Sequence, residues 1–143
     1  MAAFTINLGI GDLQRSLGAF QTYDAQTQAR LQSTVQSSTS AIMLGAKRRA
    51  RVRSGQLVKN ITMSYDGVKN VGIVRAKSPH AHLVEYGARA ATERPKNKKA
   101  LTVGDGFAAS ANIPARQAYP FMRPAFEDEK PNLVRGTETA VKP

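Results

Sequence analysis

The side chains best suited to chemistry in this chain are His80, His82 and Glu85, which are ligand types that hold zinc. Positions 80 and 82 do not share one face of a helix. The chain has no cysteine and no third histidine to complete a ligand set. Ordinary hydrogen bonding near a turn is therefore the favoured interpretation, and we expect no metal site.

Two glycine pairs could serve a nucleotide, but neither has the full pattern. Gly9-Ile10-Gly11 lacks the third glycine of a dinucleotide loop, and Gly104-Asp105-Gly106 lacks the Lys-Ser or Lys-Thr that ends a phosphate loop. The chain also lacks a Gly-x-Ser-x-Gly nucleophile motif. We therefore interpret both glycine pairs as turns and expect neither a cofactor nor an enzymatic reaction.

The charge of the chain is more distinctive than its potential for catalysis. The net charge is +11, and residues 1–40 and 101–143 are each neutral overall. Residues 41–100 hold fourteen Lys and Arg against Asp66, Glu85 and Glu93, so the whole excess lies in the middle of the chain. A field this one-sided attracts polyanions, of which phosphate is the commonest.

The basic side chains gather in two clusters. They are Lys47, Arg48, Arg49, Arg51 and Arg53, and then Arg94, Lys96, Lys98 and Lys99. A charge run is often no more than a solvated helix face or loop. Two interpretations therefore stand side by side: a solvated surface, and a surface that faces DNA phosphates or an acidic protein partner.

The N-terminal part of the chain is predicted to be mainly helical. Asp12 can cap a helix whose apolar residues recur at helical spacing, and a fainter apolar stripe continues to Ala50. This pattern predicts one long helix or two joined helices that end before Ser54-Gly55, where glycine is the expected stop. Because residues 26–40 are rich in Gln, Ser and Thr, such a helix needs packing partners.

A β-hairpin is predicted next. Residues 61–65 and 71–76 alternate in the manner of strands, and Asp66-Gly67 marks the turn between them. Residues 80–86 then read as a short helix or strand that Gly87 stops.

The segment from Ala88 to Ala118 shows little periodicity. A connection of this length in a compact domain is usually functional or disordered. Residues 101–103 and Phe107 could form a small hairpin at its centre. We expect a long loop or arm that becomes ordered by contact with a neighbouring subunit or ring.

Residues 119–127 read YPFMRPAFE and predict a rigid corner. Pro120 ends the preceding segment, whereas Pro124 can sit in the first turn of a helix. The acidic residues at 127–129 suit the positive end of that helix. After Lys130-Pro131 we expect a polar tail.

Together these elements predict a single α+β domain with a long N-terminal helix or two, an antiparallel sheet built on a hairpin, a long loop and a short C-terminal helix. The expected segments are 1–53 (mainly helical), 54–87 (hairpin and following segment), 88–118 (loop or arm), 119–130 (helix) and 131–143 (tail). The start of the chain has no basic region and no long apolar run, so we expect a soluble protein without membrane contact.

Three motifs occur in order along the chain: RSGQL at 53–57, SPHAHLVEYG at 78–87 and PFMRPAF at 120–126. In this order they resemble the small neck or tail-completion proteins of long-tailed bacteriophages, over roughly residues 41–130. The segment between Gly87 and Pro120 is longer than in the family pattern, and the basic run before Ser54 is heavier.

The resemblance implies a structural virion protein whose subunits form a ring of six or twelve copies. Such a ring would join head to tail, contact adjacent neck and tail-tube proteins, and pass double-stranded DNA through its lumen without reading sequence. It would assemble in the host cytoplasm. The resemblance also implies architectural roles for Glu85, Tyr86, Gly87, Pro120, Phe121, Arg123, Pro124 and Phe126.

In such a ring the junction between sheet and loop would be held by Glu85, Tyr86 and Gly87. The last helix would be fixed on the sheet by Pro120, Phe121, Arg123 and Pro124. Phe121 and Phe126 are expected to be core or interface anchors. The side chain of Arg123 could pair with Glu85 or with the next subunit.

Two other classes of function fit parts of the sequence. A basic nucleic-acid-binding protein that acts outside a virion would share the charge, but the chain lacks interleaved aromatic residues and any groove-reading motif. An enzyme on phosphorylated substrates would need an acid, base or metal set, and none can be named.

Overall fold

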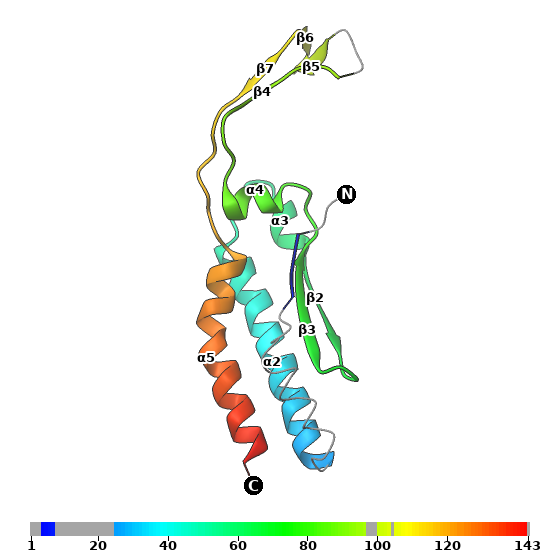
Figure 1. Cartoon of the computed structure of the whole chain (residues 1–143), viewed down its shortest axis with the longest axis vertical. Coiled ribbons are helices and arrows are strands. Elements are labelled where there is room, and N and C mark those ends of the chain that lie inside the picture. Colours follow the sequence, from blue (N-terminus) through cyan, green and yellow to red (C-terminus); the bar gives the residue numbers. More distant parts are fainter. Residues whose placement is uncertain (1–3, 8–24, 97–99, 104, 143) are drawn as a thin grey trace.

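The computed structural model describes residues 4–7, 25–96, 100–103 and 105–142, and within these ranges the chain forms an α+β fold (Figure 1). The elements in chain order are β1 (Phe4–Asn7), α2 (Ala25–Arg49), α3 (Gln56–Lys59), β2 (Ile61–Asp66), β3 (Val71–Ala76), α4 (Ala81–Tyr86), β4 (Ala91–Glu93), β5 (Leu101–Val103), β6 (Gly106–Ala108), β7 (Ala111–Ile113) and α5 (Met122–Val141). The predicted α+β class is confirmed. The part of the predicted first helix that precedes Ala25 lies outside the described residues.

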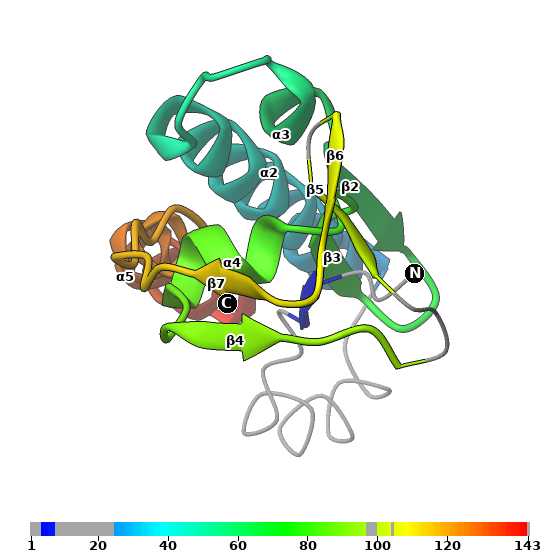
Figure 2. The same cartoon turned by 90° about the horizontal axis from the view of Figure 1, so that it is seen from above.

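Helix α2 lies between helix α5 and the three-stranded sheet (Figures 1 and 2). Helix α5 runs antiparallel to α2, and α3 and α4 lie near the C-terminal end of α2. The segment from Ala88 to Ala118 projects beyond α4 as an arm before the chain returns to α5. The molecule is therefore elongated, with the arm at one end of the helix pair.

The sheet is antiparallel with strand order β1-β3-β2. Strands β2 and β3 pair from Ile61 opposite Ala76 to Asp66 opposite Val71, so the predicted hairpin is confirmed. Strand β1 pairs with the other edge of β3 and was not predicted. The four residues of β1 are too few for an alternation of apolar and polar side chains to indicate a strand, and the strand that pairs with them, β3, is distant in the sequence.

The hairpin turn is held by side chains at its two ends. The Asp66 Oδ1 atom accepts hydrogen bonds from the backbone N–H of Val68 at 3.0 Å and of Lys69 at 3.2 Å. The Tyr65 hydroxyl donates to Asn70 Oδ1 at 2.9 Å, and Asn70 has a φ of 52°. Burial, together with the nearby charge of Asp66, raises the pKa of Tyr65 above its ordinary value.

A polar helix can pack in the interior here because its two buried hydroxyl groups both donate hydrogen bonds. Ser38 and Thr39 are buried in α2. Thr39 Oγ1 donates to the Val35 carbonyl at 2.6 Å, and it faces Gly72 of β3. A Cβ atom at Gly72 would lie 2.8 Å from Thr39 Cβ, so the helix approaches the sheet more closely than any larger residue allows.

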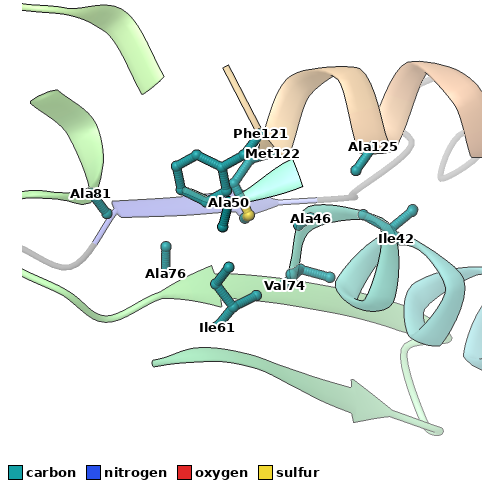
Figure 3. Close-up of a cluster of buried hydrophobic side chains, with 10 residues drawn as sticks. All are labelled: Ile42, Ala46, Ala50, Ile61, Val74, Ala76, Ala81, Phe121, Met122 and Ala125. Carbon is teal, nitrogen blue, oxygen red and sulfur yellow. The ribbon is translucent and has the colours of Figure 1, made fainter. Parts of the chain in front are cut away.

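The core joins all the layers but consists mainly of small side chains (Figure 3). Its members are Ile42, Ala46 and Ala50 from α2, Ile61, Val74 and Ala76 from the sheet, Ala81 from α4, and Phe121, Met122 and Ala125 from the start of α5. Phe121 is the largest of the fully buried side chains. The start of α5 is therefore packed into the centre of the fold.

The expectation that the last helix stops at Lys130-Pro131 and leaves a polar tail is wrong. Helix α5 continues through Pro131 to Val141. A proline inside a helix costs about 3 kcal/mol, but Leu133, Thr137 and Ala140 after it are buried on one face, and α5 packs along α2. Tertiary packing therefore outweighs the local signal to stop.

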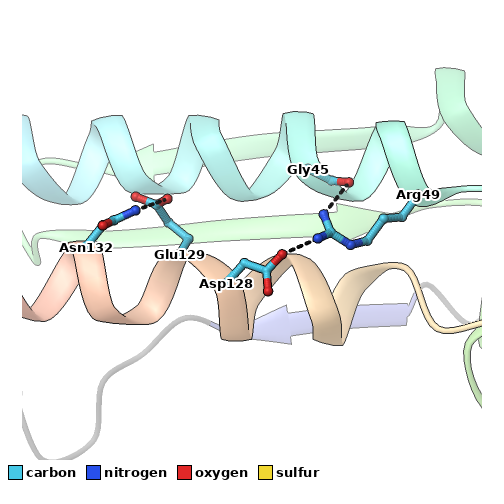
Figure 4. A network of polar contacts seen from close by, with 5 residues as sticks. All are labelled: Gly45, Arg49, Asp128, Glu129 and Asn132. Atoms are coloured by element: carbon cyan, nitrogen blue, oxygen red, sulfur yellow. Dashed lines mark hydrogen bonds and ion pairs between the residues drawn. The ribbon is translucent and has the colours of Figure 1, made fainter.

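The acidic residues at 127–129 do not complement the start of α5, contrary to expectation, because its first turn holds no acidic side chain. Asp128 and Glu129 connect α5 to α2 instead. Asp128 forms an ion pair with Arg49, which also donates to the Gly45 carbonyl at 3.4 Å (Figure 4). Glu129 accepts from Ser38 Oγ at 3.0 Å.

Helix α2 ends before Ser54-Gly55, as predicted, but the expectation that Gly55 stops it is wrong. Helix α2 ends at Arg49, and the Ala50 N–H still donates to the Ala46 carbonyl at 2.9 Å. Gly55 instead precedes α3, with a φ of 74°. Because Ala50 is anchored in the core, the chain must leave the helix axis there to reach the hairpin.

Replacing Gly72 by alanine should destabilise the protein by about 1–3 kcal/mol, because the added methyl group meets Thr39. Urea denaturation of Gly72→Ala measures this loss. The double variant Gly72→Ala/Thr39→Ala should recover part of it by removing the Thr39 hydroxyl and methyl groups. Equal stability of wild type and Gly72→Ala would contradict the close approach of α2 to β3.

Candidate functional site: the junction at the base of the arm

The chemistry of the junction centres on the carboxylate of Glu85, which is 2% exposed at the end of α4. Glu85 Oε2 accepts hydrogen bonds from the backbone N–H groups of Phe121 at 2.8 Å and Met122 at 3.0 Å. Glu85 Oε1 accepts from the N–H of Arg123 at 2.9 Å. One side chain from α4 therefore caps the N-terminus of α5.

This cap satisfies every free donor at the start of α5. A helix leaves its first four N–H groups without an internal partner. Here they belong to positions 121–124; Glu85 takes the first three, and Pro124 has no N–H. The helix dipole also favours a negative charge at this end. Burial of the carboxylate is thus compensated by three hydrogen bonds and by the field of the helix.

The chain leaves α4 through Gly87, which crosses the returning leg of the arm. Gly87 has a φ of 75° and a ψ of −178°, a conformation almost restricted to glycine. A Cβ atom there would lie 2.7 Å from the Arg116 carbonyl oxygen and 2.9 Å from the Ala118 nitrogen. The two legs of the arm can therefore touch only because this residue has no side chain.

Backbone hydrogen bonds join the two legs at this crossing. The Ala88 N–H donates to the Arg116 carbonyl at 2.9 Å, and the Arg116 N–H donates back at 2.7 Å. The Tyr119 N–H donates to the Val84 carbonyl at 2.7 Å. The cap and these bonds hold both ends of the arm against α4.

The arm consists of two short antiparallel ladders. Strand β4 pairs with β7, and strand β5 pairs with β6. The predicted small hairpin around residues 101–108 is therefore confirmed. Most side chains of the arm are exposed, including Phe107, which is 81% exposed.

The first basic cluster divides into side chains with different roles. Lys47, Arg48 and Arg49 form the last turn of α2, where positive charge is favourable at a helix C-terminus. Arg49 is engaged by Asp128, whereas the guanidinium of Arg51 stacks on the Tyr119 ring with its carbon 3.3 Å from the ring centroid. Lys47 is half-buried, and Arg48 and Arg53 are exposed.

The second basic cluster lies on the arm. Arg94 and Lys96 follow β4 and are exposed. Lys98 and Lys99 lie outside the described residues. The first cluster thus lies at the base of the arm, near the middle of the molecule's long axis, and the described part of the second lies farther out on the arm (Figure 1).

A pocket with a volume of about 640 Å³ lies at the base of the arm, and we call it the arm-base pocket. Its apolar lining is Leu57, Leu83 and Val84, and its cationic lining is Arg51, Arg53 and Arg116. His80 also lines it, but no Asp or Glu does. The pocket can therefore accept an apolar side chain together with a negative charge.

A family model described as "Bacteriophage HK97-gp10, putative tail-component" matches residues 11–87, more than half of the chain. The chain belongs to this family of bacteriophage tail components. No curated protein and no solved structure matches the chain. The resemblance to phage tail proteins noted from the three motifs is confirmed, and the protein is a structural component of a phage tail.

The match to the HK97-gp10-like family ends at Gly87, where the arm begins. The matched part holds the α2 helix, the hairpin and α4 with Glu85. Helix α5 lies beyond it, yet its N-terminus is capped by a residue within it. The family region and the C-terminal helix therefore form one structural unit, with the arm inserted between them.

The structure brings the motif residues together in different ways. Glu85 meets Phe121 and Arg123 through backbone donors, and the Arg123 side chain is exposed rather than paired with Glu85. Phe126 is half-buried against the core. Tyr86 is 63% exposed, and Pro120 directly precedes the capped turn.

Two features of this tail component escaped sequence reasoning. Arg116 stands alone in the sequence, so only its pairing with Ala88 across the arm base reveals that it lines the same pocket as Arg51 and Arg53. Ser38 reads as one more polar residue of a Ser-rich helix, although it contacts Glu129. In the described part of the chain no three potential metal ligands converge and no helix is long and apolar enough to span a bilayer.

Replacing Glu85 by glutamine should cost about 1–3 kcal/mol of unfolding free energy, because the amide NH₂ would face one of the three N–H donors. Chemical denaturation measures the change. Glu138→Gln, at an exposed position of α5, the helix that Glu85 caps, serves as the control and should shift stability by less than about 0.5 kcal/mol. Similar losses in both variants would argue against the cap.

Gly87→Ala can be compared with Gly55→Ala, because both glycines have a φ near +75°, but only Gly87 is crowded and it also has an extended ψ of −178°. Gly55→Ala should cost about 1–2 kcal/mol from backbone strain alone. Gly87→Ala should cost more and should open the arm base, which limited proteolysis within residues 88–118 would detect. Equal stability and equal protease resistance would contradict the crossing at Gly87.

Proposed function

We propose that this tail component is a ring-forming subunit of the phage neck that joins the head to the tail around the DNA channel. The observation that supports it most is the presence of exposed cations both at the base of the arm and on the arm of an elongated subunit. Family membership makes a phage tail the setting. A neck ring is the part of such a particle in which a basic surface would face DNA.

The charges at the arm end are poorly balanced within the described part of the subunit. Among the described residues of the arm, Arg89, Arg94, Lys96 and Arg116 are exposed against the exposed acidic residues Glu93 and Asp105. Arg48 is exposed at the base of the arm, and Glu85 of α4 is buried under α5. Arg49 is the member of the first cluster with an intramolecular ion pair among the described residues. Exposed cations of this kind favour contact with a polyanion.

Ring symmetry would multiply this surface. In a closed ring one face of each subunit repeats around the axis, so a modest basic patch becomes a continuous band. DNA in the lumen would then be held through its phosphates, without base contacts. We assign this role to Lys47, Arg48, Arg94 and Lys96, and leave Arg49 and Arg51 to the fold because they already have partners.

The elongated shape fits a connecting role. The α2–α5 pair and the sheet form a body, and the arm extends from one end of it (Figure 1). Because the contacts of the arm with the body among the described residues lie at its base, it can reach a neighbouring subunit or ring without disturbing the body. The rival function, a basic nucleic-acid-binding protein that acts alone, would give this arm no task.

Charge reversal at the two ends of the molecule tests the proposal. The variant Arg48→Glu/Arg94→Glu/Lys96→Glu should assemble into particles but retain DNA poorly. In vitro, the logarithm of the DNA-binding constant falls as the logarithm of the salt concentration rises. Each lost phosphate contact should make this slope less steep by about 0.9 for duplex DNA. All three side chains are exposed, so thermal unfolding should show little change.

The matched control places the same change of charge at the far end of the helix pair. It is Arg30→Glu/Arg135→Glu/Lys142→Glu, at exposed positions near the start of α2 and along α5. This control should leave DNA retention and the salt slope unchanged. Equal effects of the two triple variants would show that net charge alone matters and would overturn the assignment of the arm end to DNA.

A further inference from the structure

We propose that the tip of the arm of one subunit docks into the arm-base pocket of the next subunit. The inference deepens the proposed ring and rests on it, because it names the contact that would link neighbouring copies. Its two halves are the tip residues Asp105 and Phe107 and the pocket formed by α3, α4 and the returning leg of the arm.

The arm needs a partner surface to be stable. Its ladders have two strands each and three residue pairs each. An isolated two-stranded ladder is marginally stable in water at best, because neither face is covered. The strands β4 and β6 have no buried residue, and the described side chains of the arm are exposed or half-buried.

The tip carries an apolar anchor beside a single charge. Residues 101–108 contain one charged side chain, Asp105, and Phe107 is 81% exposed. Phe107 pairs with Thr102 across β5 and β6, so both side chains lie on one face of the hairpin. A large exposed aromatic residue at the end of a projecting arm is typical of an interface anchor.

The arm-base pocket has the complementary chemistry. Its apolar side chains, Leu57, Leu83 and Val84, can receive an aromatic ring. Its three arginines can bind a carboxylate, and no acidic residue lines the pocket to compete for them. Arg51 is already held in place by its stacking on Tyr119, which reduces the entropy lost on binding.

A subunit cannot fill its own pocket in this way. The tip hairpin lies at the far end of the arm from α3 and α4 (Figure 1). Docking must therefore join two copies head to tail, and each copy gives one tip and receives one. Such heterologous contacts close into a ring when the rotation between copies permits it.

Duplex DNA fits the pocket less well than the tip does. Phosphates would use the arginines, but they would leave Phe107 and the apolar lining of the pocket in water. The tip satisfies both kinds of group at once. The remaining exposed cations, among them Arg48, are then free for the DNA.

Disulfide trapping tests the contact directly, because the natural chain has no cysteine. The variant Ser54→Cys/Thr102→Cys places one thiol on the pocket lining and one beside Phe107. Mild oxidation of the assembled protein should give a ladder of cross-linked multimers on a non-reducing gel. The control Val68→Cys/Thr102→Cys, with a thiol on the exposed hairpin turn, should give none.

Two further variants measure the energy of the contact. Phe107→Ala should weaken association of subunits by about ten- to a hundredfold, as expected for loss of a buried aromatic side chain. Asp105→Arg should weaken it as well, and Arg53→Asp in the same chain should restore it. The association constant is measured by light scattering over a range of protein concentrations. Purified particles are the second source of assembled protein.

The outcomes separate this inference from the proposed function. If wild-type protein forms closed oligomers, but trapping fails and Phe107→Ala associates normally, then the docking is wrong and the ring stands. If wild-type protein is monomeric in solution and its copy number in particles does not match a closed ring, the proposed function is wrong and the docking falls with it.

Discussion

The fold depends on a single buried carboxylate. The first turn of α5 has three backbone donors that no local side chain satisfies, and Glu85 meets all of them from α4, 36 residues before Phe121. This contact orients α5, and Phe121 thereby enters the core. Without it, a charged group and three N–H groups would be left unpaired in the interior, which is a costly state.

The same contact explains how a long arm can interrupt a small fold. The arm leaves the body directly after Glu85 and returns directly before Phe121, so the two ends of the insertion meet at the cap. Loop closure then costs little extra, since the cap already holds both ends together. The arm can therefore project for assembly while the body keeps its packing.

A second constraint is the position of α2 between two different partners. Apart from Leu31 and Ile42, its buried residues are small or polar, and it approaches β3 at Gly72 and α5 at Ala125. Close approach of this kind lets a Ser- and Thr-rich helix be stable with few large apolar side chains. The ion pair of Arg49 with Asp128 and the hydrogen bond of Ser38 to Glu129 add polar contacts along the α2–α5 interface.

Local patterns accounted for much of the fold. The β2–β3 hairpin, the small hairpin of the arm and the place of Pro124 in the first turn of α5 follow from alternation, turn residues and proline geometry, which act over a few residues. The predictions that failed concern helix ends and a strand. Helix α5 passes through Pro131, and β1 forms only by adding to β3. Both results depend on surfaces supplied by distant segments.

The sequence by itself determined the α+β class, the concentration of charge between residues 41 and 100, and the phage tail family through motifs that include Glu85 and Phe121. Only the tertiary structure decided what these residues do. It paired the Glu85 carboxylate with backbone donors instead of the Arg123 side chain, and it brought Arg116 beside Arg51 and Arg53. The physical reason is that hydrogen bonds and charge clusters depend on distance in space, which spacing along the chain does not record.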